Sequence, residues 1–237
     1  MPVTHEPVQW EEPSDFQMRL WEEKHLEEEA PGKKTSKWET AHVTISRQFG
    51  ARGFAIGQLL AQKLGWELYG SNIIEHIAKK AKLREKVISE FDERKHSSKL
   101  TQLLFSPGSY SSDKYYRHLV QVILSISRKG KAVIIGRGAN FVTDKANGLH
   151  VRVIGNLHER ARRYAEKEGI PFKEALKKVE AVDRQRAEFV RTYYHADISD
   201  PQNYDLVINV EYLNNEQITD IIIAALEVRL GEPRPKD

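Results

Sequence analysis

A glycine-containing loop directly follows the first strand-like segment of the chain. The β-branched run over residues 42–46 leads into Arg47-Gln-Phe-Gly50-Ala-Arg52-Gly53, and apolar residues at helical spacing follow over residues 54–64. Glycines let a backbone turn tightly and direct its N–H groups at a phosphate, and the N-terminus of the next helix adds partial positive charge. The segment therefore predicts a phosphate-binding loop, although a glycine-containing strand–helix turn without a ligand shows the same local pattern.

This loop departs from the standard phosphate-loop pattern G-x-x-x-x-G-K-[ST]. Arg47 and Arg52 stand at the two glycine positions, Gly53 stands at the lysine position, and Phe54 or Ala55 stands at the Ser/Thr position. Either arginine could supply the charge of the missing lysine, and Arg52 is the preferred candidate. The residues expected to contact phosphate are Ser46, Arg47, Gln48, Gly50, Ala51, Arg52, Gly53, Phe54 and Ala55.

Further arginines stand where they can reach a bound phosphate. One follows the apolar run over residues 132–136, and two lie in the motif Asp-Arg-Gln-Arg at 183–186. Three more, Arg160, Arg162 and Arg163, lie on a helix predicted after residue 156. Phosphoryl transfer requires alignment and positive charge, and the guanidinium fork supplies both. Acidic residues at helical spacing, such as Glu159 and Glu180, could instead pair with the helical arginines. The candidate catalytic residues are Arg52, Arg137, Arg160, Arg163, Arg184 and Arg186.

Strands and helices alternate along the body of the chain. Strands are predicted over residues 42–46, 66–69, 132–136, 149–154 and 204–209. Helices are predicted over residues 54–64, 72–81, 84–93, 115–129 and 217–230, with a loop over 106–113. A long basic helical region over residues 157–194 is broken near Gly169 and Pro171. This alternation predicts an α/β fold with a parallel sheet, in which ligands bind at the carboxyl ends of the strands.

Composition excludes several kinds of site. The chain has no cysteine, which rules out disulfides, thiolate catalysis and cysteine-ligated zinc, and its nine histidines show no metal-ligand spacing. We therefore predict no resident metal site. No apolar run approaches the roughly 18 residues of a membrane helix, and residues 1–10 lack the features of a secretory signal. We expect a cytoplasmic protein with no membrane contact.

The chain divides into an acidic extension and a basic body. Residues 1–40 are punctuated by prolines and rich in glutamate, and the segment over residues 15–29 could form one helix or stay disordered. We expect an extension over residues 1–40, one domain over residues 41–232 and a tail over residues 233–237. The extension could dock on a protein partner or a second copy of the chain. The basic body suits an anionic partner such as a nucleotide, but net charge alone favours an ordinary solvated surface of mixed charge.

Several motifs in order resemble the cytidylate kinase-like family. They are Val43-Thr-Ile-Ser-Arg-Gln-Phe-Gly-Ala-Arg-Gly-Phe-Ala-Ile-Gly57, the Leu-Gly-Trp-Glu-Leu-Tyr run at 64–69, Ala-Val-Ile-Ile-Gly-Arg-Gly-Ala at 132–139, Val-Glu-Ala-Val-Asp-Arg-Gln-Arg at 179–186 and Asn-Tyr-Asp-Leu-Val-Ile-Asn at 203–209. The family's loop already lacks the phosphate-loop lysine. Here Arg52 stands where the family usually has glycine, Gly138 replaces the aspartate of a Gly-Arg-Asp motif, and Gly70-Ser71 replaces an acidic residue followed by a basic one.

The resemblance implies a three-layer P-loop kinase-like fold, with about five parallel strands, helices on both faces and a helical lid. It implies transfer of the γ-phosphate of ATP, with Mg²⁺ arriving on ATP, to a nucleoside monophosphate, CMP or dCMP first. By the same similarity Arg137 would hold the acceptor monophosphate, and Asp183 and Arg184, in the segment similar to the family's lid, are further candidate acceptor residues. Asp183 could orient an arginine rather than bind metal.

Other functions fit parts of the sequence. The altered loop fits a nucleotide-binding regulatory module without turnover, and the fold leaves room for a phosphotransferase with a different small acceptor. A nucleic-acid-binding protein ranks last, because the chain shows no groove-reading or base-stacking motif.

Overall fold

The computed structural model describes residues 36–70 and 110–235. The helices predicted over residues 72–81 and 84–93, the predicted loop up to residue 109, Ser71 and most of the acidic extension lie outside these residues. Ser36–Asp237 forms one compact unit, and the fold below is the fold of that unit. Among the described helices, none is long and apolar enough to cross a membrane.

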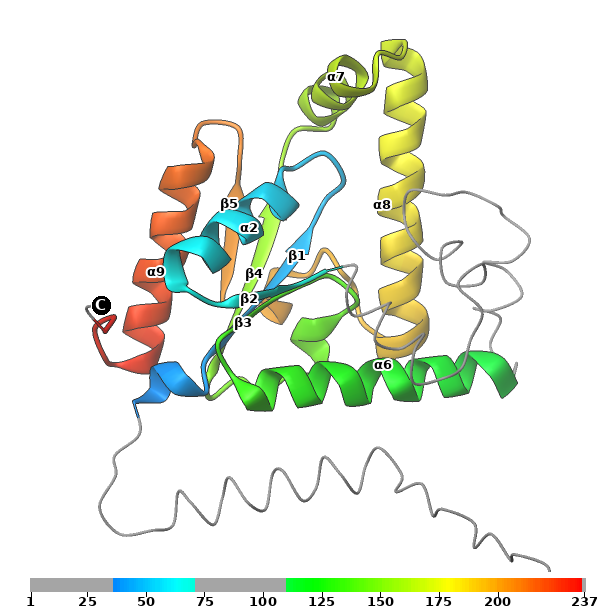
Figure 1. Cartoon of the computed structure of the whole chain (residues 1–237). Coiled ribbons are helices and arrows are strands. Elements are labelled where there is room, and N and C mark those ends of the chain that lie inside the picture. The colour runs from blue at the N-terminus through cyan, green and yellow to red at the C-terminus, as the bar shows by residue number, and fades with distance from the viewer. Residues whose placement is uncertain (1–35, 71–109, 236–237) are drawn as a thin grey trace, which may run out of the picture. The chain divides into compact units, whose positions relative to one another are not determined.

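Five parallel strands form one sheet in the order β2-β3-β1-β4-β5 (Figure 1). Strand β1 lies in the middle, between β3 and β4, so the chain moves toward one edge of the sheet after β1 and toward the other edge after β3. Such a reversal opens a crevice at the carboxyl ends of the strands, where α/β proteins bind ligands. The strands are β1 (His42–Arg47), β2 (Glu67–Tyr69), β3 (Ala132–Ile135), β4 (Gly148–Ile154) and β5 (Leu206–Asn209).

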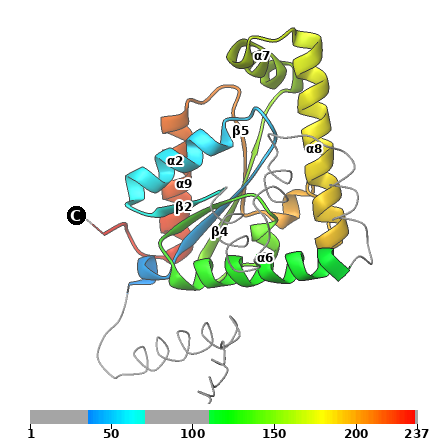
Figure 2. The same ribbon diagram turned by 45° about the vertical axis from the view of Figure 1, so that its right-hand side comes forward.

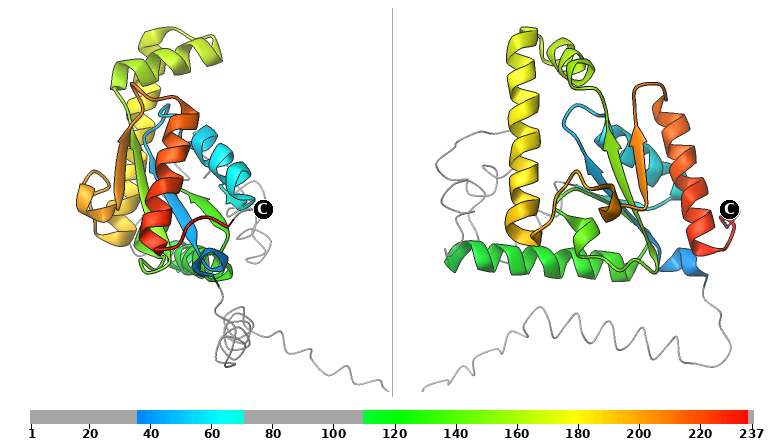
Figure 3. Two further views of the ribbon diagram at one scale, coloured as in Figure 1. Left: turned by 90° about the vertical axis from the view of Figure 1, so that its left-hand side faces the viewer. Right: turned by 180° about the vertical axis from the view of Figure 1, so that it is seen from behind.

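Helices cover both faces of the sheet, as predicted (Figures 2 and 3). Helices α2 and α9 lie on one face, and α6 and α8 lie on the other. Helix α7 and the first turns of α8 stand beyond the carboxyl ends of the strands (Figure 1). The helices are α2 (Gly53–Leu64), α6 (Tyr110–Lys129), α7 (Leu157–Glu168), α8 (Phe172–Tyr194) and α9 (Asn215–Leu230). The expected break in the long basic helical region is confirmed between α7 and α8.

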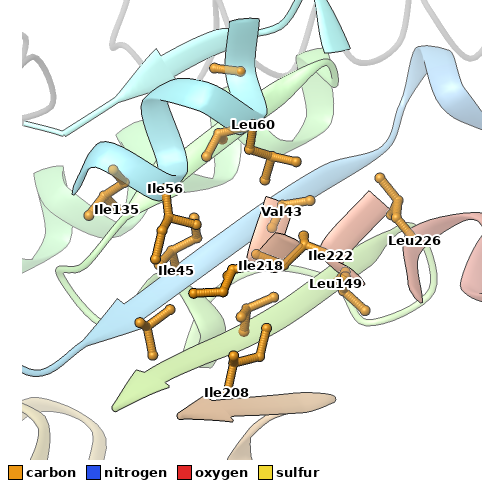
Figure 4. Packing of buried hydrophobic residues seen from close by; sticks show 14 of the residues in the cluster. Val43, Ile45, Ile56, Leu60, Ile135, Leu149, Ile208, Ile218, Ile222 and Leu226 are labelled. Carbon is orange, nitrogen blue, oxygen red and sulfur yellow. The ribbon is translucent and has the colours of Figure 1, made fainter. Parts of the chain in front are cut away.

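The larger core lies between the sheet and the α2–α9 layer. Alternate residues of β1, Val43 and Ile45, point into it and are fully buried (Figure 4). Ile56 and Leu60 of α2 meet them, because residues four apart share one face of a helix. Helix α9 contributes Ile218, Ile222, Leu226 and Leu230 at the same spacing. This layer fixes the position of α2, and therefore of the loop before it.

The smaller core lies under α6, with the face that its periodicity predicts. Leu119, Val122, Ile123 and Ile126 are buried against Ala132 and Ile134 of β3. The helix begins at Tyr110 rather than at residue 115, so the predicted loop over 106–113 is wrong for its last four residues. Ser111, Ser112 and Asp113 suggest a turn, but the same residue types are also common in the first turn of a helix.

The compact unit begins before the expected domain start at residue 41. Trp38, in the short helix η1 (Lys37–Glu39), is 3% exposed and packs edge-on against Trp66 with 6.0 Å between ring centroids. The Ser36 hydroxyl donates to Glu232, and the Lys37 ammonium donates to the carbonyl of Leu230. The last residues of the predicted extension therefore close the end of the core.

Candidate functional site

The glycine-containing loop leads from the carboxyl end of β1 into α2 and packs tightly on its neighbours. A Cβ on Gly50, which has φ +75°, would lie 2.9 Å from the carbonyl oxygen of Arg160, and a Cβ on Gly53 would lie 2.7 Å from the Cβ of Arg47. Both glycines are therefore required by close approach. Arg52 adopts φ 59° at the N-cap of α2 and makes no side-chain cap.

Carbonyl groups of the loop are turned toward the arginines of α7 and α8. The carbonyl of Arg47 accepts from Arg186 at 2.7 Å, that of Phe49 from Arg160 at 2.8 Å, and that of Gly50 from Arg163 at 3.4 Å. The carbonyl of Gln48 accepts from the N–H of Ala51. The loop carbonyls thus point toward donors, and the N-terminus of α2 keeps the unsatisfied N–H groups that every helix start presents.

Arg160 and Asp183 form a partly buried ion pair that fastens this loop to α7 and α8. Asp183 accepts from Arg160 at 2.6 Å and from the N–H of Phe49 at 2.7 Å. Arg160 also donates to the carbonyl of Gly155, and its side chain is only 4% exposed. Asp183 thus contacts an arginine, as the hypothesis of an orienting role requires. The buried position of Arg160 favours a positioning role rather than direct contact with a transferring phosphate.

Arg52 does not point its charge at the loop. Its guanidinium donates to the carbonyls of Val210 and Leu213, in the connection between β5 and α9. Burial lowers the pKa of Arg52, the nearby Arg163 lowers it further, and Glu211 opposes the shift. Arginine stays charged under such shifts. This arrangement favours a role in joining two loops over the lysine-like role expected from the sequence.

The remaining expected residues lie in different surroundings. Arg186 stacks over Phe49 with 5.6 Å to the ring centroid, and Arg163 lies 3.7 Å from Glu211. Arg184 is exposed on α8, as are Phe54 and Ala55 in the first turn of α2. Gln48 accepts from the N–H of Gly155 through its side-chain oxygen, and Ala51 is buried. Within the described residues, no group of three or more potential metal-ligating side chains is found.

Gly138 has a structural reason to lack a side chain. It adopts φ +67°, and a Cβ there would overlap the ring of Tyr194 at the end of α8. The Tyr194 hydroxyl donates to the carbonyl of Arg137 at 2.8 Å. The ring of Tyr194 therefore packs against the backbone where the resembling family carries an aspartate, while Arg137 stays at the carboxyl end of β3.

Sequence reasoning missed Arg152 and Tyr204. Arg152 lies on β4, is 7% exposed and donates to the Ser46 hydroxyl at 2.7 Å. Its guanidinium stacks on Tyr204 with 5.8 Å to the ring centroid. Burial is the main cause that lowers the pKa of Arg152 and raises that of Tyr204. A signal was present in the sequence, because a central parallel strand rarely carries a charged residue inside an apolar run.

The chain resembles known kinases along most of this domain. The model of the cytidylate kinase-like family matches residues 42–212. A cytidylate kinase of Methanosarcina barkeri is 27% identical over 194 residues, which cover 80% of this chain and 98% of that protein. A cytidylate kinase of Pyrococcus horikoshii is 31% identical over 104 residues, covering 44% of this chain and 54% of that protein.

Other similarities are more limited. A protein named uronate isomerase, from Corynebacterium glutamicum, is 31% identical over 114 residues, which cover 48% of this chain and only 22% of that protein. The chain thus spans about half or less of the length of several curated relatives. The crystal structure of an uncharacterized protein from Eubacterium ventriosum aligns with 80% of this chain and 99% of that one, with a TM-score of 0.60 and 21% identity. That likeness concerns the fold.

Proposed function

The chain belongs to the cytidylate kinase-like family, and we propose that it transfers the γ-phosphate of ATP to a nucleoside monophosphate. CMP and dCMP are the first acceptors proposed, since the relative from Methanosarcina barkeri that matches 80% of this chain is a cytidylate kinase. Family membership and the parallel α/β sheet support the kinase class. The identity of the acceptor is a separate part of the proposal and rests on the relatives alone.

One observation carries the proposal beyond the family. The start of α2 has no side-chain cap, while the loop before it turns its carbonyls toward arginines of α7 and α8. A helix N-terminus in this state is a ready site for a phosphate, because its N–H groups and its dipole both favour an anion. The site also lies beside the central strand where the sheet topology reverses.

In the proposed reaction an oxygen of the acceptor phosphate attacks the γ-phosphorus of ATP. The bond from that phosphorus to the β,γ-bridging oxygen breaks, ADP leaves with the electron pair, and the acceptor becomes a diphosphate. The α2 N-terminus would hold the donor phosphates, and Mg²⁺ would enter as Mg·ATP. Arg137, Asp183 and Arg184 are the proposed acceptor residues, and Arg186 and Arg163 would add positive charge beside the loop.

The test is ADP formation from Mg·ATP by the purified protein against a panel of nucleoside monophosphates. Arg137→Ala should lose turnover with the active acceptor while keeping the thermal midpoint of the wild type. Arg162→Gln is the matched control, because Arg162 is exposed and, among the residues that the structure describes, forms its ion pair with Glu159 on its own helix. Absence of ADP formation with every monophosphate would refute the proposed activity.

A second candidate is a nucleotide-binding module without turnover. The observation that favours it is the engagement of Arg52 with the carbonyls of Val210 and Leu213, which draws away the preferred substitute for the missing lysine. This candidate predicts saturable ATP binding and no ADP formation. A phosphotransferase with a different small acceptor would instead form ADP only outside the monophosphate panel. We propose that the protein acts in the cytoplasm.

A further inference from the structure

Arg152 is a buried charge on the sheet face that looks toward α8. It stands opposite Ser46 in the register of β4 against β1, and both side chains lie on this face. Thr44 and His150 lie two residues earlier on the same strands and are joined by a 2.8 Å hydrogen bond. A polar band therefore runs along the two central strands and ends, at the carboxyl side, in the guanidinium of Arg152.

The charge of Arg152 is poorly compensated by the protein. Among the described residues no carboxylate lies within ion-pair distance of it, and its hydrogen-bond partners are the neutral hydroxyls of Ser46 and Tyr204. Asp183 and Asp197 attract the charge of Arg152 only from farther away, and Arg160 and Arg186 repel it. A guanidinium has five N–H donors, and burying such a group without an anion is costly.

The two nearby carboxylates are already engaged elsewhere. Asp183 accepts from Arg160 and from the N–H of Phe49. Asp197 accepts from both the hydroxyl and the N–H of Ser199. The local charge of three arginines and two aspartates is therefore positive. Within the part of the chain that the structure describes, Arg152 is the arginine of this group that has no close carboxylate or carbonyl partner.

The position of Arg152 suits the acceptor rather than the donor. The loop continues into α2 on one face of the sheet, whereas Arg152 and Ser46 lie on the opposite face, near Asp183 and Arg186 of α8. The aromatic ring of Tyr204 flanks the guanidinium, and the Tyr204 hydroxyl donates to the carbonyl of Ile198. These contacts hold the plane of the guanidinium while leaving donors for another group.

We propose that Arg152 and the hydroxyl of Ser46, on the sheet face that looks toward α8, bind the phosphate of the acceptor monophosphate. The inference rests on the proposed function, because it assumes that the acceptor carries a phosphate. Arg152 would supply two parallel N–H donors to that phosphate, and Ser46 would supply a third. The anion would then compensate a charge that the protein itself meets with two neutral hydroxyls, those of Ser46 and Tyr204.

The test compares Arg152→Lys with the wild type. Lysine keeps the charge and the apolar stem but loses the planar fork. Calorimetric titration with CMP, with inorganic phosphate and with Mg·ATP is expected to show at least about tenfold weaker binding of CMP and of phosphate in the variant, from the loss of one charge-assisted hydrogen bond. Binding of Mg·ATP should be unchanged. Arg162→Lys on the exposed side of α7 is the matched control.

Steady-state kinetics separate binding from a structural role. If Arg152 binds the acceptor, Arg152→Lys raises the KM for the acceptor and leaves the KM for ATP unchanged. If Arg152 has a structural role, the variant changes both KM values and the thermal midpoint. Equal affinity of wild type and variant for CMP and phosphate would overturn the proposal, and so would a loss confined to ATP. If Arg152→Lys does not fold, a crystal structure of the wild type with CMP decides, and a phosphate beyond hydrogen-bond reach of Arg152 overturns the proposal.

Failure of the proposed function gives a different pattern. If the wild type forms no ADP with CMP but binds phosphate in a manner that Arg152→Lys abolishes, the anion site stands and the acceptor is another phosphate ester. If the wild type binds neither CMP nor phosphate, the anion site itself is refuted.

Discussion

Replacing Asp183 by asparagine is expected to loosen the junction between the phosphate loop and the helices α7 and α8. The change keeps the shape of the side chain and an oxygen that can accept from the N–H of Phe49. It removes the negative charge that faces Arg160 at 2.6 Å. The side chain of Arg160 is 4% exposed, so water compensates its charge poorly after the change.

The expected cost is about 2–3 kcal/mol in the free energy of unfolding. Removing one partner of a fully buried ion pair costs about 3–5 kcal/mol. The side chain of Asp183 is 24% exposed and asparagine retains one hydrogen bond, so the expected cost lies below the range for a fully buried pair. For a domain of this size, the loss corresponds to a thermal midpoint lower by about 4–12 °C.

Urea unfolding at neutral pH, followed by circular dichroism, measures this difference. Glu159→Gln is the control, because it breaks an exposed pair with Arg162 on α7, and such pairs contribute less than about 1 kcal/mol. A double-mutant cycle with Arg160→Met should give a coupling of at least about 1 kcal/mol. If Asp183→Asn lowered the free energy of unfolding no more than the control and showed no coupling to Arg160, the Arg160–Asp183 ion pair would not fasten the loop and the reasoning would be refuted.

Three further predictions follow from the buried polar groups and the unusual backbone. Burial and the neighbouring His150 lower the pKa of His42 to about 4, so between pH 6.5 and 4 the unfolded chain binds a proton that the folded chain does not. The free energy of unfolding should therefore decrease, by up to about 3 kcal/mol, as the pH is lowered from 6.5 to 4. His42→Gln should flatten the pH dependence of the urea midpoint, and an unchanged slope would contradict this explanation. Gly138→Asp should lower the thermal midpoint, since the left-handed backbone and the Tyr194 ring oppose a side chain at a cost of roughly 1–3 kcal/mol, and the same change in a Tyr194→Ala background should cost less. Arg52→Gly should lose about 1 kcal/mol net, because relief of the left-handed conformation only partly offsets the lost bonds to Val210 and Leu213, and it should change the KM for ATP by less than about tenfold; a complete loss of turnover in the folded variant would restore the lysine-like role.

The elements of the fold could be predicted where periodicity was strong. The apolar run over residues 132–136 gave a central strand, and Leu119, Val122, Ile123 and Ile126 gave the buried face of α6. Helix ends were harder, since Ser111, Ser112 and Asp113 suit a turn and a first helical turn equally. These limits are local ambiguities of residue type, and tertiary packing resolves them.

The roles of single arginines could not be predicted from spacing. Arg160 and Arg162 lie two residues apart on one helix, yet the side chain of the first is 4% exposed and that of the second 60%. Which face of α7 meets the loop depends on packing across the sheet. The same holds for Arg52, whose partners Val210 and Leu213 are about 160 residues away in sequence. The contact of Asp183 with an arginine could be predicted, because its motif places it beside several arginines.

The most direct test of the central claim is to follow the phosphate itself. Phosphorus NMR of the protein with Mg·ATP and CMP should show ADP and CDP appearing in equal amounts, at a rate that Arg137→Ala reduces by at least about a hundredfold and Arg162→Gln leaves unchanged. Appearance of ADP with inorganic phosphate and no diphosphate product, or no change in the spectrum with any nucleoside monophosphate, would contradict a nucleoside monophosphate kinase.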